Sequence, residues 1–321
     1  MAKMNNRVYG VIGIVSKMAN WNADFTGRPK TTSDGDIYGS DKACKYAMKK
    51  MWSNDANKKV LYIRSYKIDP KAKGDLKDKL QPKELIERYQ EIFGTEKLEK
   101  KTPSKEVLKN LFSAIDVMNF GAAFAVADHN ISITGAVQIH QGFNKYEDSK
   151  VEVQDILSPF RNSKNEEADM TSLGKKIVSD EAHYFYPFSV NPENYNDFIG
   201  LVDDFEGYTK EAYYEFKNAA LVAATALNTN SKAGCENEFA LFIECKENSQ
   251  LYLPNLCDYI SFEKGTDKNI IDLSKLAFVV NTNIAESIEN IEIYYNPYTT
   301  TIKHSFGDNA KLINIFTREA L

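Results

Sequence analysis

The sequence ISITGAVQIHQGFN at residues 131–144 alternates apolar and polar residues like a strand, breaks at Gly135 and then resumes. Glycine inside a strand often marks a bulge or a point where another backbone or a ligand comes close. A second stretch, MTSLGKKIV at residues 170–178, places Gly174 before two lysines, which predicts a turn followed by two positive charges. A strand interrupted by glycine and a basic loop that begins with a glycine turn suit a long polyanion better than a small metabolite. We therefore expect the two stretches to form one binding groove.

Size and composition indicate a folded soluble protein. The chain has 321 residues, of which 43% are apolar and 26% charged, enough for one large domain with insertions or for two domains. It has no run of eighteen apolar residues, and its first residues, MAKMNNRVYG, lack the apolar segment of a signal peptide. The four cysteines have no CxxC spacing, so we expect reduced thiols. These features predict a cytoplasmic protein without membrane association.

The net charge of -5 conceals an asymmetry between the two ends of the chain. Residues 1–110 contain 24 Lys and Arg against 14 Asp and Glu, whereas the remainder contains 16 against 31. A basic half would neutralise phosphates, and opposite charges on the two halves would favour head-to-tail association of copies. The alternative is that surface charge simply varies along the chain.

The N-terminal region combines a buried strand with a long polar loop. The nearly continuous apolar sequence RVYGVIGIV at residues 7–15 predicts a buried strand. Residues 16–39 have no periodicity, and a loop of this length in a compact domain is usually functional or disordered. Its aromatic and cationic residues, as on surfaces that bind single-stranded nucleic acid, are Trp21, Phe25, Arg28 and Lys30.

A helix with a basic stripe follows the loop. Ser40 is the expected N-cap of a helix that ends near Trp52, and Asp41 is favoured in the first turn. Cysteine, alanine and methionine side chains at i, i+3, i+4 and i+7 form the expected buried face. We expect the lysines of the basic stripe to lack carboxylate partners, so that bound phosphates relieve their repulsion, although a solvated face is the alternative. These lysines are Lys42, Lys45, Lys49 and, at the end of the stripe, Lys50.

The remaining elements follow an α+β plan. We expect strands at 59–67, 116–127, 182–190 and 237–245 and a strong helix at 209–227. This order of strand, helix, strand, repeated once, is the ferredoxin-like plan. Residues 69–115 form an expected helical insertion, with helices at 82–93 and 103–115. Residues 147–175 are polar and predict a projecting arm, and short strands are expected after residue 251.

The common catalytic and nucleotide-binding motifs are incomplete in this sequence. The segment MTSLGKKI lacks the first glycine and the final hydroxyl residue of a P-loop, and GVIGIV lacks the third glycine of a dinucleotide turn. The four histidines show no HExxH spacing, so we expect no metal and no cofactor. The loop aspartates Asp24, Asp34 and Asp36 would serve a metal or phosphodiester cleavage, but loop aspartates are more often turn formers.

Several motifs, in order, resemble the CRISPR-associated Cas seven family, whose members are crRNA-binding backbone subunits of type I Cascade complexes. The likeness spans roughly residues 7–245 and is nearest to the subtype I-B form. The sequence departs from the family pattern at Ala23, Ala136 and Asn230, where the family has glycine, proline and arginine. The matching segments are Asn22-Ala23-Asp24, Arg28-Pro29, SDKACKYAMKKMW, DVMNFGAAF, TGAVQI, Leu173-Gly174-Lys175-Lys176, Asn191-Pro192, TNSKAG and ALFIEC.

The resemblance implies a hand-like architecture for the chain. An RRM-like palm would carry a helical finger insertion and a projecting thumb arm, with copies stacked along a guide RNA. The protein would hold the RNA backbone while base pairing reads the target. The implied division places the palm at 1–68, 116–146 and 182–321 with a web loop at 16–39, the fingers at 69–115 and the thumb at 147–181.

The resemblance also implies partners and RNA-binding residues. The partners are guide crRNA, target DNA through the guide, further copies in a helical filament and other Cascade subunits, and no catalysis is expected. One alternative is a metal-dependent backbone ribonuclease of the type III kind that uses a loop aspartate. Another is an oligomeric RNA-binding protein outside CRISPR. The implied RNA-binding residues are Asn22, Arg28, Lys42, Lys45, Lys49, Lys50, Gly135, Gln138, His140, Gly174, Lys175, Lys176, Ser231 and Lys232.

Overall fold

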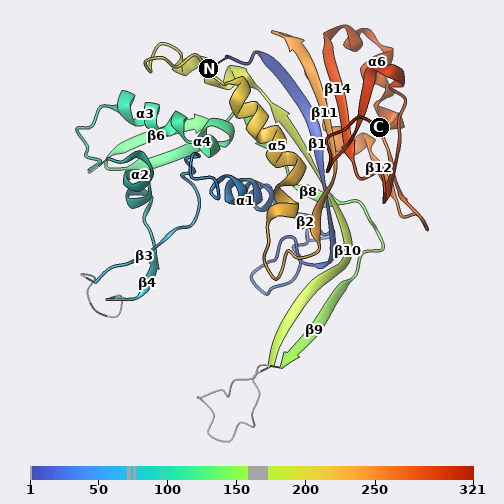
Figure 1. Cartoon of the computed structure of the whole chain (residues 1–321), viewed down its shortest axis with the longest axis horizontal. Helices are drawn as coiled ribbons and strands as arrows, with labels where there is room; N and C mark the ends of the chain where they lie inside the picture. The colour runs from blue at the N-terminus through green and yellow to red at the C-terminus, as the bar shows by residue number, and fades with distance from the viewer. Residues whose placement is uncertain (1, 71–73, 75–76, 96, 158–172) are drawn as a thin grey trace, which may run out of the picture.

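A nine-stranded, mostly antiparallel sheet forms the centre of the molecule (Figure 1). The computed structural model describes residues 2–70, 74, 77–95, 97–157 and 173–321. Residues 158–169 of the predicted arm lie outside the described residues, as do residues 170–172 of the stretch 170–178. The prediction of a mixed fold of helices and strands is confirmed.

The predicted N-terminal strand is the central strand of this sheet. Strand β1 (Asn6–Ala19) pairs antiparallel with β10 (Leu173–Val190) on one side and with β11 (Cys235–Glu247) on the other. Because both of its faces are covered, its apolar run is nearly continuous. The strands follow the order β16-β14-β11-β1-β10-β8-β2, and β7 and β9 also pair with β10. The strands of this sheet not yet given are β2 (Tyr38–Gly39), β7 (Val137–Ile139), β8 (Gly142–Asn144), β9 (Val151–Leu157), β14 (Ile288–Tyr295) and β16 (Ala310–Asn314).

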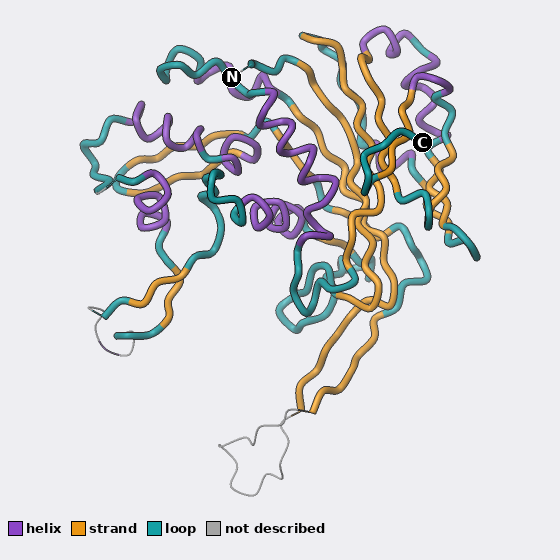
Figure 2. Tube along the Cα trace, in the orientation of Figure 1, coloured by secondary structure: helices purple, strands orange, loops and turns teal. Residues whose placement is uncertain are grey.

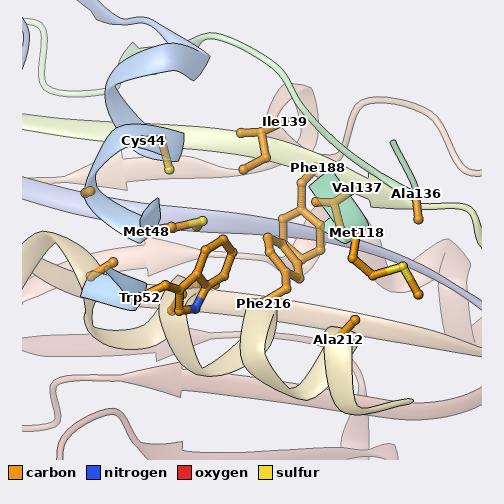
Figure 3. Packing of buried hydrophobic residues seen from close by; sticks show 14 of the residues in the cluster. Cys44, Met48, Trp52, Met118, Ala136, Val137, Ile139, Phe188, Ala212 and Phe216 are labelled. Carbon is orange, nitrogen blue, oxygen red and sulfur yellow. The ribbon is translucent and has the colours of Figure 1, made fainter. Parts of the chain in front are cut away.

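Two helices cover one face of the sheet. The apolar faces of α1 (Asp41–Trp52) and α5 (Lys210–Ala226) meet over β1 and β10, as Figure 3 shows for Met48 and Trp52 of α1 and Phe216 of α5. The Thr209 side chain caps α5 by accepting a hydrogen bond from the Ala212 N–H. Both helices and their buried stripes follow the predicted periodicity.

The C-terminal region covers the opposite face of the sheet (Figures 1 and 2). A three-stranded sheet and several short helices bury Val11, Phe185 and Phe239 in a second core. The elements of this layer are β12 (Ser261–Glu263), β13 (Asn269–Asp272), β15 (Thr300–Lys303), α6 (Phe278–Asn281) and the 3-10 helices η3 (Leu256–Tyr259), η4 (Ser274–Ala277), η5 (Asn283–Ser287) and η6 (Gly307–Asn309). A further 3-10 helix, η2 (Pro192–Phe198), follows β10.

A separate lobe lies beside α1 and differs in part from the predicted helical insertion (Figure 1). The predicted strand at 59–67 is wrong: residues 59–65 are irregular, because the Asp116 carboxylate accepts hydrogen bonds from the Leu61 and Tyr62 N–H groups. The elements of the lobe are β3 (Tyr66–Ile68), β4 (Leu80–Pro82), α2 (Leu85–Phe93), α3 (Ser104–Ser113), α4 (Ile115–Phe120), β5 (Gly121–Val126) and β6 (His129–Thr134).

The predicted strand at 116–127 is wrong in its first half. Residues up to Phe120 form α4, and the chain turns at Gly121, whose φ of +76° favours glycine. The following β5 pairs with β6 in a two-stranded sheet of its own. The stretch at 131–144 is therefore shared between two sheets, since β6 ends at Thr134 and β7 joins the main sheet.

The predicted arm is a two-stranded ribbon that projects from the main sheet (Figure 1). Strand β10 begins at residue 173, so it is much longer than the strand expected at 182–190, and its first part pairs with β9. The polar residues at the start of β10 are not suited to a buried strand. They are extended because β9 supplies partners for their backbone hydrogen bonds.

Within the described residues no helix has the length and apolarity needed to span a membrane. The four cysteines are buried and unpaired, as expected for reduced thiols. Burial raises the pKa of the Cys44 thiol to about 12, so this thiol stays protonated at neutral pH.

Candidate nucleic-acid interface

A cleft opens at the N-terminus of α1. Its volume is about 460 Å³, and its walls include two aromatic rings, Tyr38 and Phe143, whose centroids lie 6.0 Å apart. The two rings meet because β2 pairs with β8. The Nζ atom of Lys30 lies 6.0 Å from the Tyr38 ring centroid. The cleft is lined by Lys30, Thr32, Tyr38, Ser40, Asp41, Lys42, Gln141 and Phe143.

The loop before α1 is tied to this cleft. The Ser40 side chain caps α1 by accepting a hydrogen bond from the Ala43 N–H at 3.3 Å. The Ser40 N–H in turn donates to Oδ1 of Asn22 at 2.8 Å. Asn22 therefore positions the start of the helix, while Arg28 lies exposed in the same loop.

The basic stripe of α1 is only partly free, which corrects the expectation that its lysines lack carboxylate partners. Lys45 lies 3.0 Å from Oδ2 of Asp41, and Lys49 lies 3.7 Å from Oδ2 of the buried Asp116. Burial lowers the pKa of Lys49, and the negative charge of Asp116 opposes that effect. Lys42 and Lys50 are exposed. The stripe thus contains two cations that hold the fold together and two that face solvent.

Asn20 joins three segments that carry predicted site residues. Its side-chain amide donates to the carbonyl oxygens of Gly27 and Ile177, both at 3.0 Å, and its backbone N–H donates to the Ser231 carbonyl at 2.9 Å. Lys232 Nζ donates to the Asn20 carbonyl at 2.5 Å. The structure therefore brings the 16–39 loop, the root of the arm and the loop containing Ser231 together. No sequence signal singles out Asn20, because loop asparagines are common turn formers.

Lys232 has a structural task at this junction. Burial lowers the pKa of Lys232, and its ammonium group is occupied by the Asn20 carbonyl. Ser231 next to it is exposed. Of these two predicted RNA-binding residues, only Ser231 presents its side chain to solvent.

The segment Gly174-Lys175-Lys176 is a strand, so the predicted glycine hinge is wrong. Gly174, Lys175 and Lys176 lie opposite Ile156, Asp155 and Gln154 of β9. A Cβ atom at Gly174 would meet nothing closer than 3.8 Å, so neither packing nor turn geometry requires glycine there. Lys175 is exposed and Lys176 half-buried.

The glycine break at Gly135 serves packing between two parts of the chain. A Cβ atom at Gly135 would lie 2.1 Å from the carbonyl carbon of Phe120, so a second backbone occupies the space that glycine leaves. The Gly135 carbonyl accepts hydrogen bonds from the side chains of Gln138 and Asn194, at 2.8 and 2.9 Å. The expected close approach of another backbone is confirmed here.

Gln138 and His140 lie on the other face of the sheet from α1. Their neighbours Val137 and Ile139 belong to the core beneath α1, so alternation turns Gln138 toward the opposite face. Both line a separate cleft of about 430 Å³ beside residues 253–256. The first stretch therefore contributes to two clefts, since Gln141 and Phe143 line the one at α1, and the single groove shared with residues 170–178 stays a prediction.

The loop aspartates behave as turn formers. The Asp24 carboxylate accepts hydrogen bonds from the Thr26 N–H and hydroxyl, both at 2.8 Å, and from the Arg28 N–H at 3.0 Å. Hydrogen bonding to Thr26 lowers the pKa of Asp24. Asp34 and Asp36 flank a turn at Gly35, where the Asp36 N–H donates to the Thr32 hydroxyl. Across the described residues, no group of three or more His, Cys, Asp or Glu side chains is arranged to hold a metal ion.

The cleft at α1 is suited to an anion carrying a planar ring. Lys30 and Lys42 supply positive charge, the helix N-terminus adds a partial positive charge, and Tyr38 and Phe143 supply aromatic faces. Phe143 and Tyr38 were not among the predicted site residues. The β2–β8 pairing brings them together, so the sequence could point to the stretch 131–144 and to Lys30 and Lys42 but not to this pair of rings.

Comparison with known proteins gives a family match and similar solved structures, two of which are described here. The family described as "CRISPR-associated protein Cas7" matches residues 6–294. A chain of a "CRISPR RNA-guided surveillance complex, pre-nicking" is similar with a TM-score of 0.50 at 14% identity, covering 96% of both chains. A chain of a "CRISPR RNA-guided surveillance complex" has a TM-score of 0.48 at 13% identity, covering 95% of this chain and 94% of the other. No curated protein sequence matches the chain significantly.

Proposed function

This chain belongs to the CRISPR-associated protein Cas7 family, and from that membership we propose that it is a non-catalytic backbone subunit of a type I Cascade complex. Copies bind a guide crRNA side by side in a filament and present it for pairing with target DNA. The assembly includes other Cascade subunits and is cytoplasmic. In this arrangement the protein recognises the backbone of the guide and base pairing reads the sequence.

The cleft at the N-terminus of α1 is the observation that carries this proposal. Two cations and two aromatic rings surround it, a combination that binds single-stranded nucleic acid, and the one carboxylate in its wall, Asp41, is paired with Lys45. The excess of basic residues before residue 110 supplies a wider positive field around this end of the chain. Lys42 neutralises a guide phosphate, and Tyr38 or Phe143 stacks on a base.

The strand order supports a ferredoxin-like palm. Strand β1 lies between β11 and β10, and β10 pairs on its other side with β7 and β8, all antiparallel. The helices α1 and α5 lie on one face of these strands. This is the order of a βαββαβ unit with its two helices on the same side of the sheet. The proposed fingers, residues 69–115, lie within the lobe from β3 to β6, and the proposed thumb, residues 147–181, includes the ribbon of β9 and the first part of β10.

Five exposed members of the predicted set are the proposed RNA contacts: Arg28, Lys42, Lys50, Lys175 and Ser231. Gln138 and His140 are exposed as well, but they line the separate cleft beside residues 253–256. Lys45, Lys49 and Lys232 position the contacts, because their ammonium groups are occupied by Asp41, Asp116 and the Asn20 carbonyl. Asn22, Gly135, Gln138, His140, Gly174 and Lys176 remain predictions.

A metal-dependent ribonuclease that uses a loop aspartate is the alternative function. One carboxylate oxygen of Asp24, Oδ1, accepts three hydrogen bonds within its own turn, as in a turn former, whereas Oδ2 takes no part in these three bonds. Incubation of the assembled complex with complementary RNA and Mg²⁺ is the test. Cleavage that is lost in Asp24→Ala would overturn the non-catalytic assignment.

Purification of the complex with its RNA tests the main proposal. We expect repeat-derived guides of uniform length in the wild type and reduced RNA content in Lys30→Gln/Lys42→Gln. The matched control is Lys303→Gln/Lys311→Gln, which removes two exposed lysines from the C-terminal region and should leave RNA content unchanged. RNA of mixed origin would indicate an RNA-binding protein outside CRISPR, and a complex without RNA would overturn the proposal.

A further inference from the structure

A second cavity lies at the opposite end of α1. Its volume is about 660 Å³, within the range of pockets that hold small ligands. It is formed where the end of α1 meets residues 62–66 and α2. Its chemistry comes from three tyrosines and three cations: Tyr46, Tyr62, Tyr66, Lys50, Arg64 and Arg88.

The aromatic side chains of this cavity are unusually open. Tyr46 is 47% exposed and Tyr66 is 52% exposed, although a tyrosine ring has much apolar area to bury. Tyr62 is fixed, because its hydroxyl donates to the Ala123 carbonyl at 2.8 Å. Two open rings beside a fixed one leave flat surfaces on which a base can stack.

The charge of the cavity is unbalanced. No carboxylate lines it, and within the described residues the side chains of Lys50 and Arg64 form no ion pair. Arg88 is held by the Val60 carbonyl at 2.8 Å and by Glu91 at 2.9 Å, yet its Nε is buried and, among the described residues, has no partner. An anion would balance the charges of Lys50 and Arg64.

Hydrogen bonds hold the irregular segment that forms the wall of the cavity. The Asp116 carboxylate accepts from the Leu61 and Tyr62 N–H groups, each at 2.8 Å. The Ser65 carbonyl accepts from the Lys83 N–H at 2.9 Å. These bonds hold the irregular segment at both ends, so the rings and cations are positioned before a ligand arrives.

We propose that this cavity is a second nucleic-acid site that takes one unpaired nucleotide, with the base on Tyr46 or Tyr66 and the phosphate on Arg64 and Lys50. Lys42 and Lys50 are eight positions apart on α1, or about 12 Å along its axis. At about 3.4 Å per stacked nucleotide, that distance is three to four nucleotides of one strand. One strand therefore reaches from the cleft at the start of α1 to this cavity.

The inference deepens the proposed function and rests on it, because it names where the strand continues. The strand is either the guide RNA or the DNA that the complex binds, and both present the same phosphate and base chemistry. Ultraviolet crosslinking of the assembled complex, followed by mass spectrometry, separates the two sources. A crosslink at Tyr46 or Tyr66 that carries ribose identifies the guide, and one that carries deoxyribose and appears only after DNA is added identifies the DNA.

Binding of labelled octauridylate and octathymidylate to the purified chain measures the affinity of the cavity. Loss of one stacked base weakens binding by about fivefold to a hundredfold, so Tyr66→Ala and Arg64→Gln should each weaken binding at least fivefold. Tyr66→Phe keeps the ring and should bind like the wild type. The matched control is Tyr298→Ala, which removes a tyrosine that is 73% exposed elsewhere on the surface. Melting curves check that every variant is folded.

The outcomes separate this inference from the proposed function. If the complex retains guide RNA but neither tyrosine crosslinks and Tyr66→Ala binds both probes normally, the cavity assignment is wrong and the proposed function stands. If the complex contains no nucleic acid, the proposed function is wrong. In that case the cavity assignment survives only if the purified chain binds the probes and Tyr66→Ala weakens that binding.

Discussion

The imidazole of His183 and the carboxylate of Glu238 form a buried pair, with Nδ1 2.7 Å from Oε1. The second ring nitrogen, Nε2, lies 3.1 Å from Oε1 of Glu181. Each ring nitrogen therefore lies within hydrogen-bond distance of one carboxylate oxygen, so His183 links the buried Glu238 to Glu181. The ring also stacks on Phe262 with centroids 4.0 Å apart, which joins the main sheet to the C-terminal layer.

Removal of the imidazole should destabilise the protein strongly. His183→Ala leaves the buried Glu238 without its partner, and loss of one member of a buried pair costs about 3–5 kcal/mol. Lys264→Ala removes the more exposed partner of Glu181 and should cost less than about 1 kcal/mol. Urea unfolding at neutral pH measures both. Equal small effects would show that the buried pair contributes little.

The same network should make stability depend on pH in the acid range. Burial alone would raise the pKa of Glu181, but hydrogen bonds from Lys264 and His183 outweigh it and hold the pKa below the ordinary value of 4.5. Ionised Glu181 therefore stabilises the fold above pH 4.5, and this contribution is lost as the pH falls through the lowered pKa. Glu181→Gln should be less stable than the wild type at neutral pH by about 1 kcal/mol. The difference in Tm should shrink below pH 4.5, and a constant difference would contradict this account.

Asp116 should be essential for the lobe beside α1. Its carboxylate is fully buried and accepts two backbone N–H groups, and an amide at this position has only one oxygen to accept them. We expect Asp116→Asn to cost about 2–3 kcal/mol, because hydrogen bonds to charged groups contribute most. The matched control is Asp128→Asn, whose carboxylate forms an exposed ion pair with Lys100 and should matter little. Thermal unfolding of the two variants compares the sites.

Substitution by alanine should affect stability differently at Gly135 and at Gly174. At Gly135 a Cβ atom would overlap the Phe120 backbone, so we expect Gly135→Ala to cost about 1–3 kcal/mol or more. At Gly174 the nearest atoms are 3.8 Å away, and Gly174→Ala should change stability by no more than about 0.5 kcal/mol. Denaturant unfolding gives both values. A stable Gly135→Ala protein would show that the two backbones separate easily.

The two kinds of lysine on α1 should separate binding from stability. Lys42→Gln removes an exposed charge, so RNA binding should weaken and the slope of log affinity against log salt should fall by about 1, with Tm unchanged. Lys49→Gln leaves the buried Asp116 without its cation and should lower Tm. If Lys42→Gln binds RNA normally and with an unchanged salt slope, Lys42 does not contact a phosphate.

The elements that the sequence predicted correctly are those with strong local periodicity. The strand β1, the helices α1 and α5 and their buried stripes follow from the spacing of apolar residues alone. The errors fall where a distant residue overrides local preference. Residues 59–65 have strand-like composition, but Asp116 takes their backbone hydrogen-bond donors, and β9 turns the Gly174 segment into a strand.

The candidate site depends even more on distant contacts. The sequence placed Lys42, Lys45 and Lys49 on one helix face, and this placement is correct because helix geometry is local. It did not distinguish free lysines from paired ones, since Asp116 comes from another part of the chain. The sequence did not single out Asn20 or Tyr38, and it included Phe143 only as part of the stretch 131–144, because pairing between β2 and β8 and contacts with the root of the arm bring these residues to the site.

By itself, the sequence determined the basic N-terminal half, the capped helix with its lysines and the buried central strand, since charge and periodicity are properties of neighbouring residues. The tertiary structure alone decided which cations remain free, which face of the sheet Gln138 and His140 occupy, and that aromatic rings and unpaired cations meet at both ends of α1. The physical reason is that pairing of charges and opening of cavities depend on strand register and on contacts between residues far apart in the chain.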